Sequence, residues 1–184
     1  MKNALQRYID FGSMRLSHWL FLAAALLLVY IVTSSMKAIV VLLLLTVAGS
    51  LSTIYYHYFH GPVNFELVKL STVLAAVAYG MIPALFVGIA ATMFSRLLSG
   101  RMDATLIVSI AGIAVMAVLA AVFNSMNIVW LGIALVLLYH LLTAPLQLMM
   151  GGSLGYGAMF VGTNILFNVI LFSRVAPILL AVIK

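Results

Sequence analysis

The sequence predicts an all-α integral membrane protein, a polytopic bundle of six or seven transmembrane helices. Hydrophobic residues make up 66% of the 184-residue chain and charged residues only 7%, and the mean hydropathy is +1.29. Such values lie far outside the range of soluble globular domains. The apolar runs are about as long as the ~20 residues that cross a ~30 Å hydrocarbon core, so each run is expected to form a helix.

Residues 1–17 are expected to form an amphipathic helix on the membrane surface. They carry Lys2, Arg7 and Arg15 with apolar residues at helical spacing, which is typical of an interfacial segment. The rest of the chain, residues 18–184, is expected to form one transmembrane domain. Its expected spans, in chain order, cover about residues 18–33, 38–56, 65–79, 83–98, 104–123, 128–150 and 154–183.

Turn signals separate the first four spans. Residues 34–37 are mostly polar and predict a tight turn between the first two spans. An aromatic cluster at residues 55–60, followed by a Gly-Pro pair, marks a boundary between membrane and water. The next span ends at Gly80, and Pro83 then falls in the first turn of the following helix, where its missing N–H does no harm.

The later spans end at similar signals. Gly100 is expected to cap the fourth span, residues 124–127 form the next turn, and a Gly-Gly pair ends the sixth span. The last stretch, residues 154–183, is too long for one span at about 1.5 Å per residue. We therefore expect a break near Arg174 or Pro177 that leaves a short terminal helix. The count falls from seven to six if one of the first two spans lies in the membrane interface.

The basic residues indicate an orientation. Lys and Arg outnumber Asp and Glu by nine to three, but they are scattered and form no patch that could follow the phosphates of a nucleic acid. In a membrane protein such an excess marks the cytoplasmic side. We therefore expect a multi-pass protein of the cell (cytoplasmic) membrane with a cytoplasmic N-terminus. In that orientation the cytoplasmic side has Lys2, Arg7, Arg15, Arg96 and Arg101, and the outer side has Lys37 and Lys184.

An ion pair is predicted at the start of the third span. Glu66 lies in an otherwise apolar stretch, three residues before Lys69, so both side chains share one helix face. An ionisable group in a membrane segment indicates a functional site. The first interpretation is that the pair anchors a substrate or handles protons. The second is that the two charges neutralise each other at the helix entrance while Lys69 reaches out to the lipid headgroups.

Polar side chains in the last two spans form a second set. Asn164 and Asn168 lie four residues apart, Arg174 lies on an adjacent strip, and His140 and Gln147 belong to the sixth span. These groups must face the protein interior or a cavity, because lipid would leave their hydrogen bonds unmade. They form either a polar pocket between the third, sixth and seventh spans or hydrogen bonds that join helices. The candidate substrate-binding residues are Glu66, Lys69, His140, Asn164, Asn168 and Arg174.

The fourth span also carries a strip of small residues. Ala84, Gly88 and Thr92 recur every four residues, so we expect this helix to pack closely against a neighbour.

The reactive side chains argue against an enzyme. The chain has three acids and no cysteine, and it contains no HExxH, GxSxG or phosphate-loop motif. His57 and His60 share one helical face, but a metal site needs a further ligand. We therefore predict no catalytic residue, no cofactor and no metal site.

Several stretches resemble a known family, the substrate-binding S components of energy-coupling factor (ECF) transporters. The resemblance covers about residues 64–175 and includes Asn164 and Asn168 in the last span. It implies a six-helix fold that binds a vitamin or similar cofactor and works with a membrane coupling protein and ATPases. The stretches that carry it are Asn64-Phe65-Glu66-Leu67-Val68-Lys69-Leu70, Ala78-Tyr79-Gly80-Met81-Ile82-Pro83, Gly88 and Leu97-Leu98-Ser99-Gly100.

The Leu97-Leu98-Ser99-Gly100 ending and the terminal asparagine helix are also similar to the rod-shape-determining protein D family. That resemblance implies a non-catalytic scaffold that binds other membrane proteins. We therefore expect the small-molecule-binding component of a transporter in the lipid bilayer, with a scaffold as the alternative and an intramembrane enzyme third.

Overall fold

The computed structural model describes residues 35–58 and 61–184. The chain divides between residues 40 and 41 into two units, and the bundle described below belongs to the second. The elements of the described residues are all helical, with no strand among them, which confirms the all-α prediction. The predicted amphipathic segment, residues 1–17, and the predicted first span, residues 18–33, lie outside the described residues.

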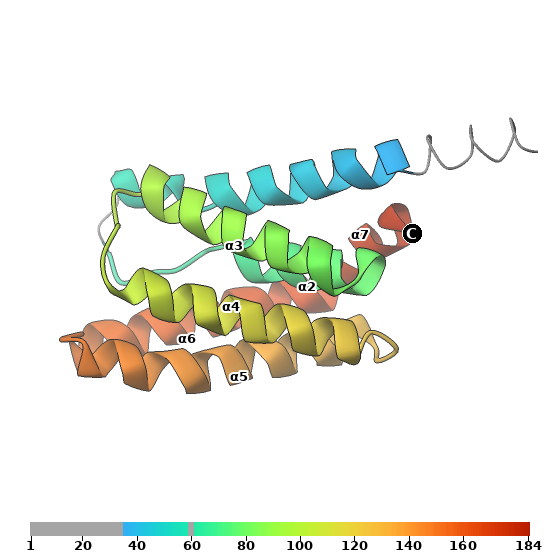
Figure 1. Ribbon diagram of the computed structural model, residues 1–184. Coiled ribbons are helices and arrows are strands. Elements are labelled where there is room, and N and C mark those ends of the chain that lie inside the picture. The colour runs from blue at the N-terminus through green and yellow to red at the C-terminus, as the bar shows by residue number, and fades with distance from the viewer. Residues whose placement is uncertain (1–34, 59–60) are drawn as a thin grey trace, which may run out of the picture. The chain divides into compact units, whose positions relative to one another are not determined.

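Figure 1 shows the order of the helices. Residues 35–51 are helical and are followed by a 3-10 turn, η1. Five of the described helical stretches are long and apolar enough to cross a membrane, and the shorter α2 lies among them. The elements are η1 (Ile54–His57), α2 (Val68–Tyr79), α3 (Met81–Leu98), α4 (Thr105–Val122), α5 (Ile128–Met149), α6 (Leu154–Ile170), η2 (Leu171–Val175, a π-helical segment) and α7 (Ala176–Ile183).

Local signals account for the ends of α3 and α5. Gly100 adopts a positive φ of 69°, and the N–H of Arg101 donates to the carbonyl oxygen of Arg96 at 3.0 Å, so the predicted glycine cap of α3 is confirmed. The Asn127 side chain accepts a hydrogen bond from the backbone N–H of Val129 at 2.9 Å and caps the start of α5.

Three predicted boundaries differ from the structure. Residues 35–37, expected in a turn, are helical, since they include neither Gly nor Pro and nothing in the backbone forces a break. The third predicted span is the 12-residue α2, only about 18 Å long, so it is shorter than the hydrocarbon core. The last stretch continues as a helix through η2, so its break is a change to π-helical hydrogen bonding and not a loop.

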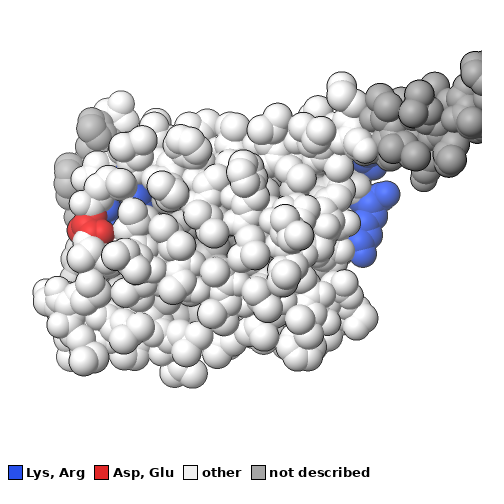
Figure 2. All heavy atoms as spheres, in the orientation of Figure 1, with Lys and Arg blue, Asp and Glu red and all other residues white. Residues whose placement is uncertain are grey.

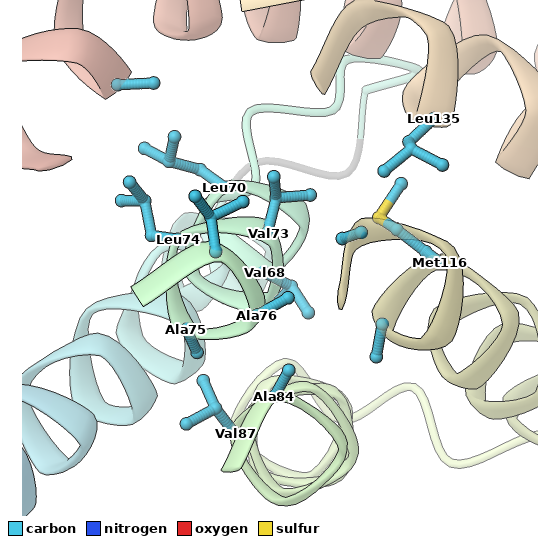
Figure 3. Packing of buried hydrophobic residues seen from close by; sticks show 14 of the residues in the cluster. Val68, Leu70, Val73, Leu74, Ala75, Ala76, Ala84, Val87, Met116 and Leu135 are labelled. Atoms are coloured by element: carbon cyan, nitrogen blue, oxygen red, sulfur yellow. The ribbon is translucent and has the colours of Figure 1, made fainter. Parts of the chain in front are cut away.

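The short helix α2 is the centre of the bundle. Every residue of α2 from Val68 to Val77 is buried, and α2 packs against α3, α4, α5 and α7. Figure 3 shows the labelled Ala84 and Val87 of α3 close to α2, and Met116 of α4 and Leu135 of α5 on another side of it. A helix that is buried on all sides has to be surrounded by other segments, and the buried Lys69, Ser71 and Thr72 of α2 also need polar partners there. Here protein surrounds it.

The small-residue strip of α3 lies against α2 and α4. Ala84 and Thr92 are buried. A Cβ atom added at Gly88 would lie 2.5 Å from Cγ2 of Ile113 in α4 and 2.8 Å from Oγ1 of Thr72 in α2. The strip therefore lets three helices approach one another inside the bundle.

The surface of the described bundle is that of a membrane protein. Large apolar side chains are exposed along its helices, and in Figure 2 the wide middle of the face shown carries no charged side chain. Such a surface is stable in lipid and insoluble in water. Examples of the exposed residues are Ile82, Phe86, Ile107, Trp130 and Leu141.

Candidate functional site

A small polar cavity lies at one end of the bundle, where α3 and α5 end and α4 and α6 begin. Its volume is about 40 Å³. A cavity of that size holds one or a few water molecules but no vitamin-sized ligand. Its walls come from η1, the segment before α2, and the helices α2 to α6.

The Glu66–Lys69 pair forms part of the cavity wall. The Lys69 side chain is only 1% exposed, and its ammonium forms an ion pair with the Glu66 carboxylate, whose side chain is 18% exposed. The ammonium also lies 4.4 Å from the ring centre of Tyr139 in α5, a distance at which a cation is attracted to the ring face. Lys69 therefore points into the protein. The second interpretation had expected it to reach out to the lipid headgroups, and it does not.

A network of amides joins α5, α6 and the segment before α2. His140 Nε2 lies 2.8 Å from Asn164 Oδ1, so the ring donates its proton to that oxygen. The Asn168 side chain donates to the same oxygen at 3.1 Å, and the Asn164 side chain donates to the carbonyl oxygen of Asn64 at 3.4 Å. The Asn64 N–H donates to Thr163 Oγ1 at 3.1 Å. These bonds hold the irregular segment before α2 against α6.

Five of the six predicted site residues lie in two adjoining clusters. Glu66, Lys69 and His140 line the cavity, while Asn164 and Asn168 lie behind His140 in the amide network. Both interpretations of the polar residues therefore have a counterpart, since there is a cavity and there are bonds between helices. The cavity also has walls from α3 and α4, which the sequence interpretation did not include. The sixth residue, Arg174, is exposed on η2 and lines neither the cavity nor the groove described next.

A larger groove adjoins the cavity. Its volume is about 640 Å³, and it is formed by the loop between α3 and α4, the loop between α5 and α6, and the helix ends next to them. This volume is within the range of small-molecule sites, about 300–1,000 Å³. The groove and the cavity share wall residues: Arg96, Arg101, Gln147 and Phe160.

The two arginines at this shared wall have different surroundings. Arg96 Nη2 donates to Ser109 Oγ at 2.9 Å, and Arg96 Nη1 lies 3.9 Å from the exposed carboxylate of Asp103. The guanidinium of Arg101 lies over two rings, 4.7 Å from the centre of Tyr56 and 5.5 Å from the centre of Phe160. No carboxylate among the described residues forms an ion pair with Arg101.

Sequence reasoning missed three residues of this site as candidates. Asn64 is buried, lines the cavity and keeps its Oδ1 without a hydrogen-bond partner among the described residues. Tyr139 faces Lys69, and its position directly before His140 is the only local hint. Arg101 was considered for membrane orientation alone, because a basic residue after a helix cap has no local sign of a binding role.

The prediction that His57 and His60 do not by themselves make a metal site stays a prediction. No group of three or more His, Cys, Asp or Glu side chains that could hold a metal ion occurs in the part of the chain that the structure describes. His60 and the side chain of His57 lie outside that part.

Comparisons with known proteins give no further identification. No model of a known protein family matches the chain, and no curated protein or solved structure matches it. The resemblances to S components and to the rod-shape-determining protein D family therefore stay predictions from the residues that carry them.

Proposed function

We propose that this chain is the small-molecule-binding component of a membrane transporter. The observation that carries the proposal is a charged cavity inside an apolar bundle that shares its wall with a groove of ligand size. The groove offers the volume for a ligand, and the cavity offers polar groups and room for water at the groove's inner wall.

The buried charges support a binding role. A charged side chain inside a membrane helix costs several kcal/mol, and such residues usually mark substrate or ion pathways. A buried ion pair often stabilises a fold less than apolar residues of the same size do. The Glu66–Lys69 pair is therefore better explained by a ligand or a transport step than by stability alone.

The short length of α2 and the irregular segment before it also support a transport role. α2 is shorter than the membrane core, and the irregular residues 61–67 before it lead into the cavity wall. Interrupted helices beside a polar site are a recurrent feature of membrane transporters. The 184 residues contain no phosphate loop, so the proposal assigns energy coupling to partner chains, a membrane coupling protein with ATPases.

A non-catalytic scaffold is the second candidate. The observation that favours it is that the buried polar groups bond to one another, as in the Glu66–Lys69 and His140–Asn164 pairs. The cavity, at about 40 Å³, is also too small for an organic ligand. In that case the polar network joins helices, and the binding surface for partner proteins lies elsewhere.

The test is to purify the full-length chain in a mild detergent and to measure bound small molecules by native mass spectrometry. We expect a bound molecule in the unmodified protein and its loss in Ala144→Trp, whose ring would fill part of the groove, with Ala181→Trp as the matched control because Ala181 is exposed and lines neither cavity nor groove. Co-purification with an ATPase pair supports transport. An empty protein that co-purifies with cell-envelope synthesis proteins contradicts the proposal and supports a scaffold.

A further inference from the structure

We propose that the groove binds an organic anion with a planar ring system, and that Arg101 is the residue that recognises its charge. This inference rests on the proposed function and names the chemical class of its ligand. Three features support it: the charge balance of the walls, the surroundings of Arg101 and the aromatic side chains beside it.

The walls of the cavity and the groove have one more cation than anion among the described residues. The cations are Lys69, Arg96 and Arg101, and the acids are Glu66 and Asp103. Lys69 pairs with Glu66, and Arg96 lies 3.9 Å from Asp103. The charge left over is that of Arg101. A partly buried charge without a counter-ion is costly, and an anionic ligand removes that cost.

Arg101 is placed at the boundary between the two spaces. Its side chain lines both the groove and the cavity and is only partly exposed. The guanidinium makes ring contacts with Tyr56 and Phe160, but no hydrogen bond or ion pair with the described residues. Its N–H groups form a fork that fits the two oxygens of a carboxylate or phosphate. Arg96 lies on the same wall, but its guanidinium already contacts Asp103 and Ser109.

The aromatic side chains beside Arg101 favour a planar ligand. The rings of Tyr56 and Phe160 are stacked at 6.3 Å with an angle of 21°, and the rings of Phe160 and Tyr156 at 6.3 Å with an angle of 20°. Tyr156 and Phe160 line the groove. A ring system in the groove can therefore pack against Tyr156 and Phe160 while its anionic group reaches Arg101, and aromatic contacts add to the affinity.

The size of the two spaces sets the position of the ligand. The groove, at about 640 Å³, takes the ring system, and the cavity, at about 40 Å³, takes only the water around the anionic end. The buried Oδ1 of Asn64 lacks a donor among the described residues, so a water molecule in the cavity is its expected partner.

The test uses the full-length protein in nanodiscs of neutral phosphatidylcholine. Binding of 1-naphthoate is measured by calorimetry beside two probes with the same rings, neutral 1-naphthylmethanol and cationic 1-naphthylmethylamine. We expect 1-naphthoate to bind most tightly. Arg101→Gln should weaken it about 10- to 100-fold, the range for a lost hydrogen bond to a charged group, and leave 1-naphthylmethanol unchanged. Arg101→Lys keeps the charge without the fork, so its affinity for 1-naphthoate should lie between those of the unmodified protein and Arg101→Gln. Lys184→Gln should not change the affinity.

The outcomes separate this inference from the proposed function. If the neutral or cationic probe binds as tightly as 1-naphthoate, or if Arg101→Gln has no effect on 1-naphthoate, the anion inference is wrong and the small-molecule site still stands. A parallel measurement uses vesicles that contain anionic phosphatidylglycerol. If the protein binds these vesicles through Arg101 but does not bind 1-naphthoate, the ligand is a lipid headgroup and the inference is also wrong. If no probe binds and the purified protein is empty, both proposals fail.

Discussion

Removing the carboxylate of Glu66 should destabilise the protein much more than removing both charges of its pair with Lys69. The Lys69 side chain is almost completely buried, and its described polar contacts are the Glu66 carboxylate and the Tyr139 ring at 4.4 Å. Glu66→Gln leaves the ammonium with the ring and a neutral amide. Breaking a buried pair at one partner costs about 3–5 kcal/mol, because the other charge stays buried without a counter-ion.

The double variant provides the comparison. In Glu66→Gln with Lys69→Met both charges are gone, and replacing a buried pair by uncharged groups of similar size is often close to neutral. We therefore expect the free energy of unfolding to fall less in the double variant than in either single variant. The coupling energy between the two side chains is then about 3 kcal/mol or more. At about 2–4 °C per kcal/mol, each single variant should lower the Tm by roughly 6–20 °C.

The assay is thermal unfolding in one detergent, followed by circular dichroism, for the unmodified protein, both single variants and the double variant. Lys184→Met is the matched control, since it removes an exposed ammonium and should change the Tm little. The reasoning is refuted if the loss in the double variant equals the sum of the two single losses. Additive losses would mean that the two buried charges do not stabilise each other.

Two further predictions concern packing and topology. Gly88→Ala should lower the free energy of unfolding by about 1–3 kcal/mol, measured by thermal unfolding, because its new methyl group meets buried side chains of α2 and α4. Gly162→Ala is the control, since open space surrounds Gly162, and it should leave the free energy of unfolding unchanged. Equal losses in the two variants would contradict this prediction. The chain has no cysteine, so Asp103→Cys and Ser125→Cys, at exposed positions beyond opposite ends of α4, allow single-site labelling. In intact cells an impermeant maleimide should label only Ser125→Cys if the N-terminus is cytoplasmic, and the reverse pattern would overturn that orientation.

Most of the helix boundaries could be predicted because their signals are local. Gly100 ends α3 through its positive φ, and Asn127 begins α5 through its side-chain cap, and both effects involve only residues a few positions away. The length of α2 could not be predicted from its apolar run. Residues 61–67 continue the chain as an irregular segment that bonds to α6, and this contact replaces the hydrogen bonds of a further helical turn.

The sequence by itself determined that the described chain is a helical bundle with a membrane-protein surface, because hydropathy and helix length are properties of each segment alone. It also identified Glu66, Lys69 and His140 as polar residues in apolar surroundings. Only the tertiary structure decided that they line one cavity and that Arg101 lies at its wall without a carboxylate. The physical reason is that these contacts join residues far apart in the chain, such as Asn64 and Asn164, 100 positions apart, and depend on how whole helices pack.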